Sequence, residues 1–256
     1  MQIFYYFCSI FRTIMDKISK AQVKIVRSLQ QKKFRDELGL FVAEGDKCVS
    51  ELTKSFELVH LFREGENASR TEIEQMSGLR TPQGVLGVFK KRPFEDWKLE
   101  IGDLVLALDG IQDPGNLGTI IRTCDWFGVH DIVCSLDTAD CYNPKVVQAT
   151  MGALARVRVH YVNLPEWLSQ QNLPIVGTLL EGKDMYEEIN RQSSIVQSSI
   201  IVMGNEGNGI SQAVRKLVTH PIRIPSYPKN IETSESLNVS IATAIVLAEF
   251  RHYNLR

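Results

Sequence analysis

The stretch NLGTIIR at residues 116–122 follows a continuous apolar run, LVLAL at 104–108, after a short loop. An unbroken apolar run of this length is typical of a parallel strand that is buried on both faces. Leu117, Ile120 and Ile121 then recur at helical spacing, and Gly128 ends the pattern. Strand, loop and helix form one βα unit, which predicts an α/β domain built on a parallel sheet.

The same alternation continues through the rest of the chain. Periodicity favours strands at 132–136, 157–161, 175–179 and 200–203, and helices at 143–153 and 236–253. Strands that alternate with helices imply a mostly parallel sheet with helices on both faces. This pattern alone predicts an open, doubly wound sheet.

The first third of the chain predicts a smaller α/β domain. Its expected elements are a basic amphipathic helix at 16–35, strands at 40–43, 56–62 and 84–89, and helices at 46–54 and 71–77. Pro93 and mixed charge mark a linker. We therefore divide the chain into an extension at 1–14, a small domain at 15–92, a linker at 93–102 and a large domain at 103–256.

Charge is unevenly distributed along the chain. Residues 1–93 carry 16 Lys and Arg against 11 Asp and Glu, whereas residues 94–256 carry 13 against 19. The stretch from Arg12 to Arg35 alone carries eight basic residues and one acid, Asp16. This asymmetry predicts that the N-terminal part contacts phosphates. Two ordinary domains with uneven surfaces are the alternative.

The five cysteines show no Cys-x-x-Cys spacing, which argues against a disulfide framework and a zinc site. Cys124 falls on an apolar helix stripe and Cys134 in a strand-like run, so we expect buried thiols in a reducing cytoplasm. Residues 1–11 are aromatic and apolar but too few to span a bilayer. We expect no bound metal, no membrane partner and a cytoplasmic location.

Three more short motifs follow NLGTIIR in a fixed order: GNEGNG at 204–209, IRIP at 222–225 and SLNVS at 236–240. Each has an ordinary structural explanation. Asn116 sits where a helix N-cap belongs, Glu206 lies in a turn, and Ser236 or Asn238 can cap the last helix. The order and spacing of the whole set are far more specific than any one motif.

The set resembles the signature motifs of the SpoU (TrmH) family, which are RNA 2′-O-ribose methyltransferases of the SPOUT class. The segment NPKVVQATMGAL at 143–154 resembles another family stretch, with Gln148 and Thr150 in place of a common Arg and Ser. Residues 24–51, with the Glu-Gly pair at 44–45, resemble the family's ribosomal-protein-like substrate-binding domain. The resemblance implies an α/β fold with a SPOUT-type deep trefoil knot in the parallel-sheet domain, and a homodimer through that domain's last helix.

The resemblance also implies which residues form the site. The catalytic set would be Arg122, Asn116, Glu206, Ser236 and Asn238. S-adenosylmethionine would be held by Thr178, Leu179, Gly204, Asn205, Gly207, Ile224 and Leu237. RNA would be contacted by Lys32, Lys33 and Arg35 on the basic helix. Because a guanidinium is a very poor base near neutrality, we expect Arg122 to grip a phosphate and stabilise the developing alkoxide.

The function expected from these motifs is S-adenosylmethionine-dependent methylation of a ribose 2′-hydroxyl in structured RNA. A separate N-terminal domain favours ribosomal RNA; a tRNA 2′-O-methyltransferase is the alternative. GNEGNG does not fit the Gly-x-Gly-x-x-Gly fingerprint of a Rossmann enzyme and follows most of the sheet. A non-catalytic RNA-binding protein with the same fold is disfavoured, because Arg122, Glu206 and Asn238 are all present.

Overall fold

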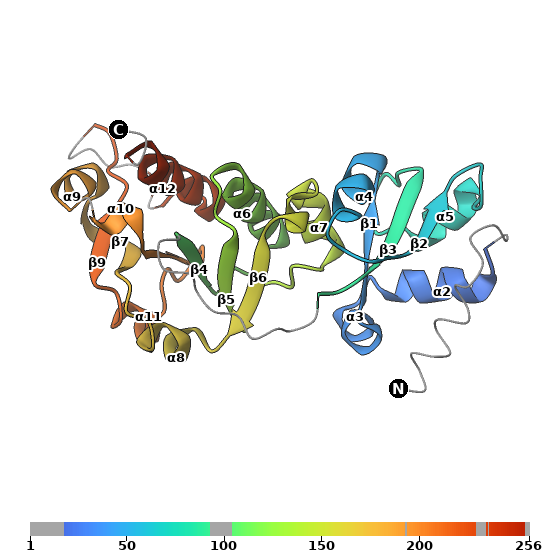
Figure 1. The fold of residues 1–256 in the computed structure, drawn as a ribbon, viewed down its shortest axis with the longest axis horizontal. Helices are drawn as coiled ribbons and strands as arrows, with labels where there is room; N and C mark the ends of the chain where they lie inside the picture. The colour runs from blue at the N-terminus through green and yellow to red at the C-terminus, as the bar shows by residue number, and fades with distance from the viewer. Residues whose placement is uncertain (1–17, 93–103, 193, 229–233, 235, 254–256) are drawn as a thin grey trace. The chain divides into compact units, whose positions relative to one another are not determined.

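The computed structural model describes residues 18–92, 104–192, 194–228, 234 and 236–253, and it divides into two compact units (Figure 1). The first unit takes the described residues up to Arg92 together with Asp140–Arg156. The second takes the described residues of 96–139 and 157–256. The segment NPKVVQATMGAL therefore packs with the small N-terminal unit, although the chain enters and leaves it from strands of the other unit.

The first unit is an antiparallel three-stranded sheet with helices packed against it. The strands are β1 (Leu40–Glu44), β2 (Leu58–Arg63) and β3 (Val85–Lys90), in the order β1-β3-β2. The helices are α2 (Lys20–Ser28), α3 (Lys32–Leu38), α4 (Asp46–Leu52), α5 (Arg70–Met76) and α7 (Pro144–Thr150), followed by the short η1 (Ala153–Ala155). Val26, Leu29, Phe62 and Met76 are fully buried in its core.

The helix expected at 16–35 is two helices in its described part. Gln31 adopts an extended conformation between α2 and α3, so the helical hydrogen-bond pattern stops there. The carbonyl groups of Leu29 and Gln30 are left without helical partners and each accepts a hydrogen bond from Arg35 Nη1 at 2.9 Å. Basic residues occur throughout the stretch 16–35, so the sequence pattern gave no sign of where the first helix ends.

The second unit contains a six-stranded sheet whose paired strands all run parallel, as the apolar runs predict. Its order is β6-β5-β4-β8-β7-β9. The strands are β4 (Val105–Asp109), β5 (Asp131–Ser135), β6 (Arg158–Val162), β7 (Ile175–Asp184), β8 (Ile200–Gly204) and β9 (His220–Arg223). Val105, Leu106, Ile132 and Ile201 are fully buried, so the central strands are covered on both faces.

Helices lie on two sides of this sheet. Helix α6 (Pro114–Trp126) packs against α12 (Val239–Tyr253), and α8 (Leu164–Ser169) packs against α11 (Gln212–Arg215). Figure 1 shows the first pair along one side of the sheet and the second pair along the other. The remaining helices are α9 (Met185–Arg191) and α10 (Ser194–Gln197). No helix in the described ranges is both long and apolar enough to cross a membrane.

Several elements differ in length from the sequence pattern; the last helix, for example, begins at Val239 and not at residue 236. Helix α7 ends at Thr150, not at Ala153, because Met151 and Gly152 take positive φ values of 52° and 91°. Strand β7 is twice as long as expected. Its Thr178 and Lys183 both pair with Ile222 of β9, so the residues between them bulge out of the ladder.

Candidate active site

The motif residues follow the carboxyl ends of neighbouring strands in the second unit. Strand β4 ends at Asp109, which pairs with Gly204 at the end of β8. The chain runs from β4 to β5 and β6 on one side, whereas β8, β7 and β9 lie on the other. A reversal of strand order of this kind opens a crevice at the carboxyl edge, which is where parallel α/β proteins bind ligands.

Asn116 is not the N-cap of α6, contrary to the expectation from its position. The cap is Asp113, whose Oδ1 accepts a hydrogen bond from the backbone N–H of Asn116 at 2.8 Å. Pro114 occupies the first helical position, where its missing N–H costs nothing. The side-chain amide of Asn116 is therefore available for contacts outside the helix.

This amide joins the three motifs in one hydrogen-bonded chain. Asn116 Nδ2 donates to Glu206 Oε1 at 2.7 Å, and Asn116 Oδ1 accepts from Asn238 Nδ2 at 3.0 Å. Asn238 Oδ1 in turn accepts from the backbone N–H of Ser240 at 3.0 Å, which caps α12. Helix capping thus orients the Asn238 amide toward Asn116, which is oriented toward Glu206. The partner of Glu206 is Asn116, and not Arg122 or Asn238.

Arg122 lies two turns into α6, outside the buried stripe formed by Leu117, Ile120 and Ile121. It is exposed and makes no hydrogen bond or ion pair with any residue that the structure describes. A guanidinium held on a helix without an internal partner can bind an anion bidentately. Ser236 is also exposed, and it makes no hydrogen bond within the described ranges, so it is not part of the Asn116–Glu206–Asn238 chain.

The glycine motif closes on itself through Asn205. The backbone groups of Asn205 and Gly209 exchange hydrogen bonds of 2.9 and 3.0 Å, and Asn205 Oδ1 accepts from the N–H groups of Gly207 and Asn208. A Cβ on Gly204 would lie 2.3 Å from the backbone of Gly209, so glycine is required there by the loop itself. A Cβ on Gly207 would meet nothing closer than 3.6 Å, which leaves open space beside the loop.

A second polar network supports this loop, and it was not predicted from the sequence. Asn205 Nδ2 donates to the carbonyl of Gly110 at 2.7 Å, and the N–H of Gly110 donates to Ser135 Oγ at 2.8 Å. Ser135 Oγ donates to Asp137 Oδ1 at 2.6 Å, and Thr138 Oγ1 lies 3.0 Å from the same hydroxyl. The sequence did contain a sign of this network, because Ser135 and Asp137 lie at or directly after the end of the strand expected at 132–136.

Two of the residues expected to hold S-adenosylmethionine, Thr178 and Leu179, lie within β7, directly after the part that pairs with β8. The others lie at or after the ends of β8 and β9 and before α12. Thr178 Oγ1 donates to the carbonyl of Val202 at 3.1 Å, so its hydroxyl ties β7 to β8. Leu179 packs against the core of the sheet, and Ile224 is partly buried. Leu237 is 49% exposed and Leu180 72% exposed. Exposed leucines offer apolar surface that fits a ligand with an apolar, planar group.

The three expected RNA contacts differ in their surroundings. Lys32 is exposed and forms an ion pair with Asp36 at 2.5 Å, and the Lys33 ammonium lies 6.0 Å from the ring centre of Phe34. Arg35 is only 1% exposed, and its Nη2 lies 2.7 Å from Asp140 Oδ2. Arg35 as an RNA contact is therefore wrong, because the break between α2 and α3 turns its side chain into the unit.

Four cysteines lie in the described ranges, and all of them are buried: Cys48, Cys124, Cys134 and Cys141. This agrees with the burial expected for Cys124 and Cys134. Burial raises the pKa of the Cys48 thiol to about 11, which outweighs a hydrogen bond from the Gly152 backbone. The Cys48 thiol therefore stays protonated near neutral pH and is unsuited to nucleophilic chemistry. No cluster of three or more His, Cys, Asp or Glu side chains in the described ranges could hold a metal ion.

A parallel sheet whose carboxyl edge carries a polar hydrogen-bonded chain is an α/β arrangement of the kind that binds ligands at that edge. The chain belongs to the SpoU rRNA methylase family, which matches residues 103–248. Residues 20–67 match the MRM3-like substrate binding domain. These matches confirm the resemblance drawn from the motifs.

Full-length relatives agree with this assignment. The 23S rRNA (guanosine(2553)-2′-O)-methyltransferase RlmP of Bacillus subtilis is 29% identical over 93% of this chain and 98% of its own length. A structure from Porphyromonas gingivalis, assigned to the TrmH family of RNA methyltransferases, is 35% identical with a TM-score of 0.81, covering 92% and 98% of the two chains. The AdoMet-bound rRNA methyltransferase of Sinorhizobium meliloti is 29% identical with a TM-score of 0.81, covering 94% and 98%.

Proposed function

We propose that this protein transfers the methyl group of S-adenosylmethionine to a ribose 2′-hydroxyl in 23S ribosomal RNA. The observation that carries the proposal is the hydrogen-bonded chain Glu206–Asn116–Asn238, which joins three distant motifs at the carboxyl edge. Arg122 follows Asn116 by six residues on the same helix, α6. Relatives of full length are named 23S rRNA 2′-O-methyltransferases, which favours ribosomal over transfer RNA.

Arg122 binds the RNA phosphate next to the target ribose in this proposal. The guanidinium is always protonated, so it cannot accept the hydroxyl proton. It stabilises the alkoxide that develops on the 2′-oxygen, and a phosphate oxygen in its grip receives the proton. The Glu206–Asn116–Asn238 chain fixes the start of α6 and α12 relative to the glycine loop. This keeps Arg122 in place for the reaction.

S-adenosylmethionine supplies an electrophilic methyl group on a sulfonium. The proposed cofactor residues lie within β7, at or after the ends of β8 and β9, and before α12: Thr178, Leu179, Gly204, Asn205, Gly207, Ile224 and Leu237. Leu237 and Ile224 offer apolar surface for the adenine, and the open space at Gly207 lets backbone approach the cofactor closely. Ser236 lies outside the hydrogen-bonded chain, and its proposed catalytic role is to contact the RNA.

We also propose a homodimer formed through α12 and α6. Ile241 on α12 is 55% exposed and Trp126 at the end of α6 is 84% exposed, and these two helices pack together. Exposed apolar side chains on adjacent helices favour a cover from a second copy. A deep trefoil knot in the second unit and a location in the cytoplasm complete the proposal.

The proposal is tested by incubating the purified protein with methyl-labelled S-adenosylmethionine and a 23S rRNA transcript, with a tRNA pool in parallel. We expect label in the 23S transcript, recovered after digestion as a 2′-O-methylated nucleoside. Label in tRNA alone refutes the assignment of 23S rRNA as the substrate. Cofactor binding without transfer to either RNA favours the non-catalytic alternative, and label on a base refutes the reaction.

A further inference from the structure

Helix α2 carries a row of three cations. Lys20, Lys24 and Arg27 stand at positions i, i+4 and i+7, so they lie within about 60° of arc at 100° per residue. All three are exposed, whereas Val23 and Val26 on the neighbouring side of the helix are buried. The row extends about 10 Å along the helix at 1.5 Å per residue. We call these three residues the α2 stripe.

The charges of the α2 stripe are not neutralised by any residue that the structure describes. None of the three cations forms an ion pair or side-chain hydrogen bond with a residue in the described part of the chain. Helix α2 itself contains no acid. Most other cations of the same unit are paired. These pairs are Lys32–Asp36, Arg35–Asp140, Lys54–Glu51, Arg63–Asp46, Arg70–Glu74, Lys90–Glu57, Lys91–Asp36 and Arg156–Glu51.

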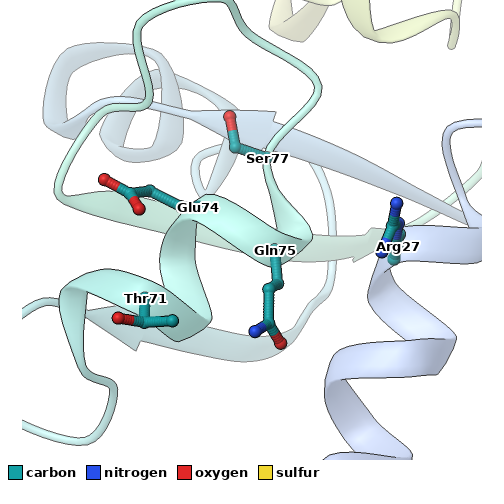
Figure 2. A pocket seen from close by; sticks show the side chains of 5 residues that line it. All are labelled: Arg27, Thr71, Glu74, Gln75 and Ser77. Carbon is teal, nitrogen blue, oxygen red and sulfur yellow. The ribbon is translucent and has the colours of Figure 1, made fainter.

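A polar pocket of about 310 Å³ adjoins the stripe at Arg27. Its other lining residues are Thr71, Glu74, Gln75 and Ser77, on or directly after α5 (Figure 2). Thr71 and Gln75 are exposed, and within the described ranges neither side chain has a hydrogen-bond partner. The Glu74 carboxylate is held by Arg70 at 2.8 Å, which offsets its negative charge.

One lining residue of the pocket, Ser77, is tied to a buried carboxylate. Ser77 Oγ donates to Glu44 Oε2 at 2.6 Å, and Glu44 Oε1 accepts from the N–H of Gly78 at 2.9 Å. Glu44 is only 4% exposed, so these bonds fix the residues that follow α5. A hydroxyl, an amide and a guanidinium around a fixed polar pocket are the groups that recognise an unstacked base or a ribose hydroxyl in RNA.

We propose that the α2 stripe binds the phosphate backbone of the RNA substrate and that the adjoining pocket takes one unpaired nucleotide. This inference rests on the proposed function, because it assumes an RNA substrate. It places the contact on α2 instead of α3, where Lys32 is paired and Arg35 is buried. A stripe of unpaired cations attracts phosphates by releasing counterions, so it makes binding depend on salt.

The test compares two triple variants that remove the same charge. Lys20→Gln/Lys24→Gln/Arg27→Gln removes the stripe, and Lys54→Gln/Arg63→Gln/Lys90→Gln removes two paired lysines and one paired arginine from the same unit. Affinity for the 23S rRNA transcript is measured from about 50 to 300 mM salt, the range over which phosphate contacts are lost. For the stripe variant we expect the slope of log K against log salt to fall by about 2–3 and binding to weaken at least about tenfold. The control keeps the wild-type slope, and S-adenosylmethionine affinity is unchanged in both.

The pocket is tested separately with Thr71→Val/Gln75→Leu. This variant keeps all charges, so we expect KM for RNA to rise while the salt slope and kcat stay at wild-type values. An unchanged KM for RNA refutes the proposal that the pocket binds an unpaired nucleotide. An unchanged salt slope in the stripe variant refutes phosphate binding by the α2 stripe. The three side chains would then form only a solvated helix face. If the stripe variant loses RNA binding but the wild type transfers no methyl group, the proposed function fails and this inference stands.

Discussion

The buried ion pair between Arg35 and Asp140 allows a quantitative prediction. Arg35 is 1% exposed and donates four hydrogen bonds: two to Asp140 Oδ2 at 2.7 and 3.1 Å, and one each to the carbonyls of Leu29 and Gln30. Arg35→Met removes all of them and leaves the Asp140 carboxylate, 11% exposed, without its counter-charge. Stranding one member of a buried pair costs about 3–5 kcal/mol, so we expect this loss in the free energy of unfolding.

The assay is urea unfolding followed by circular dichroism, together with hydrogen exchange of the peptide covering Asp140–Arg156. Exchange should accelerate most in that segment, because Asp140 belongs to it and its Arg156 is held by Glu51 at 2.6 Å. The matched control is Arg35→Met/Asp140→Leu, in which no buried charge is left. We expect it to recover part of the loss, because it leaves no stranded charge. The carbonyls of Leu29 and Gln30 and the N–H of Tyr142 still lose their partners, so the recovery is incomplete. A single variant within about 1 kcal/mol of wild type, or a double variant as unstable as the single, contradicts this prediction.

Three further predictions concern the second unit. Asn116→Ala should lower kcat at least about tenfold with unchanged S-adenosylmethionine affinity, because it disconnects the hydrogen-bonded chain; single-turnover methylation and calorimetry measure the two quantities. Burial raises the pKa of Asp131, but hydrogen bonds from His160 and Arg158 lower it more, so the net pKa lies below its ordinary 3.8. This carboxylate therefore stabilises the fold at neutral pH, and the destabilisation by Asp131→Asn should shrink as urea unfolding is repeated below about pH 4. Ile241→Glu should convert a wild-type dimer to a folded monomer by sedimentation; a monomeric wild type contradicts the dimer.

Much of the fold could be predicted, because the central strands are continuous apolar runs. Strands β4, β5 and β8 were expected from residues that prove fully buried, such as Leu106, Val133 and Ile201. The break between α2 and α3 was not predicted, since it depends on Arg35 satisfying the carbonyls of Leu29 and Gln30. Periodicity reports which face of a helix is buried, but it does not report where a long side chain replaces helical hydrogen bonds.

The site was predicted in its composition but not in its connections. Asp113 and Asn116 are both good capping residues, and Pro114 after Asp113 was the signal that decides between them. The partner of Arg35 lies 105 residues away, so no local pattern could show that this arginine is buried. For the same reason, the sequence did not reveal that Asp140–Arg156 packs with the N-terminal unit. Contacts across long sequence separations decide these cases, and only the three-dimensional structure supplies them.

The segment Asp140–Arg156 also affects how the two units can be studied. A truncated protein that begins near residue 100 would lack the residues that cover this segment, including Arg35, Glu51 and Phe41, whose ring centre lies 4.8 Å from that of Tyr142. Such a truncation would expose a buried carboxylate and apolar side chains. Substitutions in the full chain are therefore the sounder way to separate RNA binding from methyl transfer.

The proposed mechanism depends above all on Arg122, and its decisive measurement is the rate of methyl transfer to the 23S rRNA transcript by Arg122→Ala at saturating S-adenosylmethionine. The matched control is Thr123→Ala, the neighbouring half-buried position on α6, which should keep the wild-type rate. We expect a rate at least about 100-fold lower for Arg122→Ala, with unchanged cofactor affinity and thermal stability, because one transition-state charge contact is lost. A rate near that of the wild type would contradict the assigned role of Arg122 and the mechanism built on it.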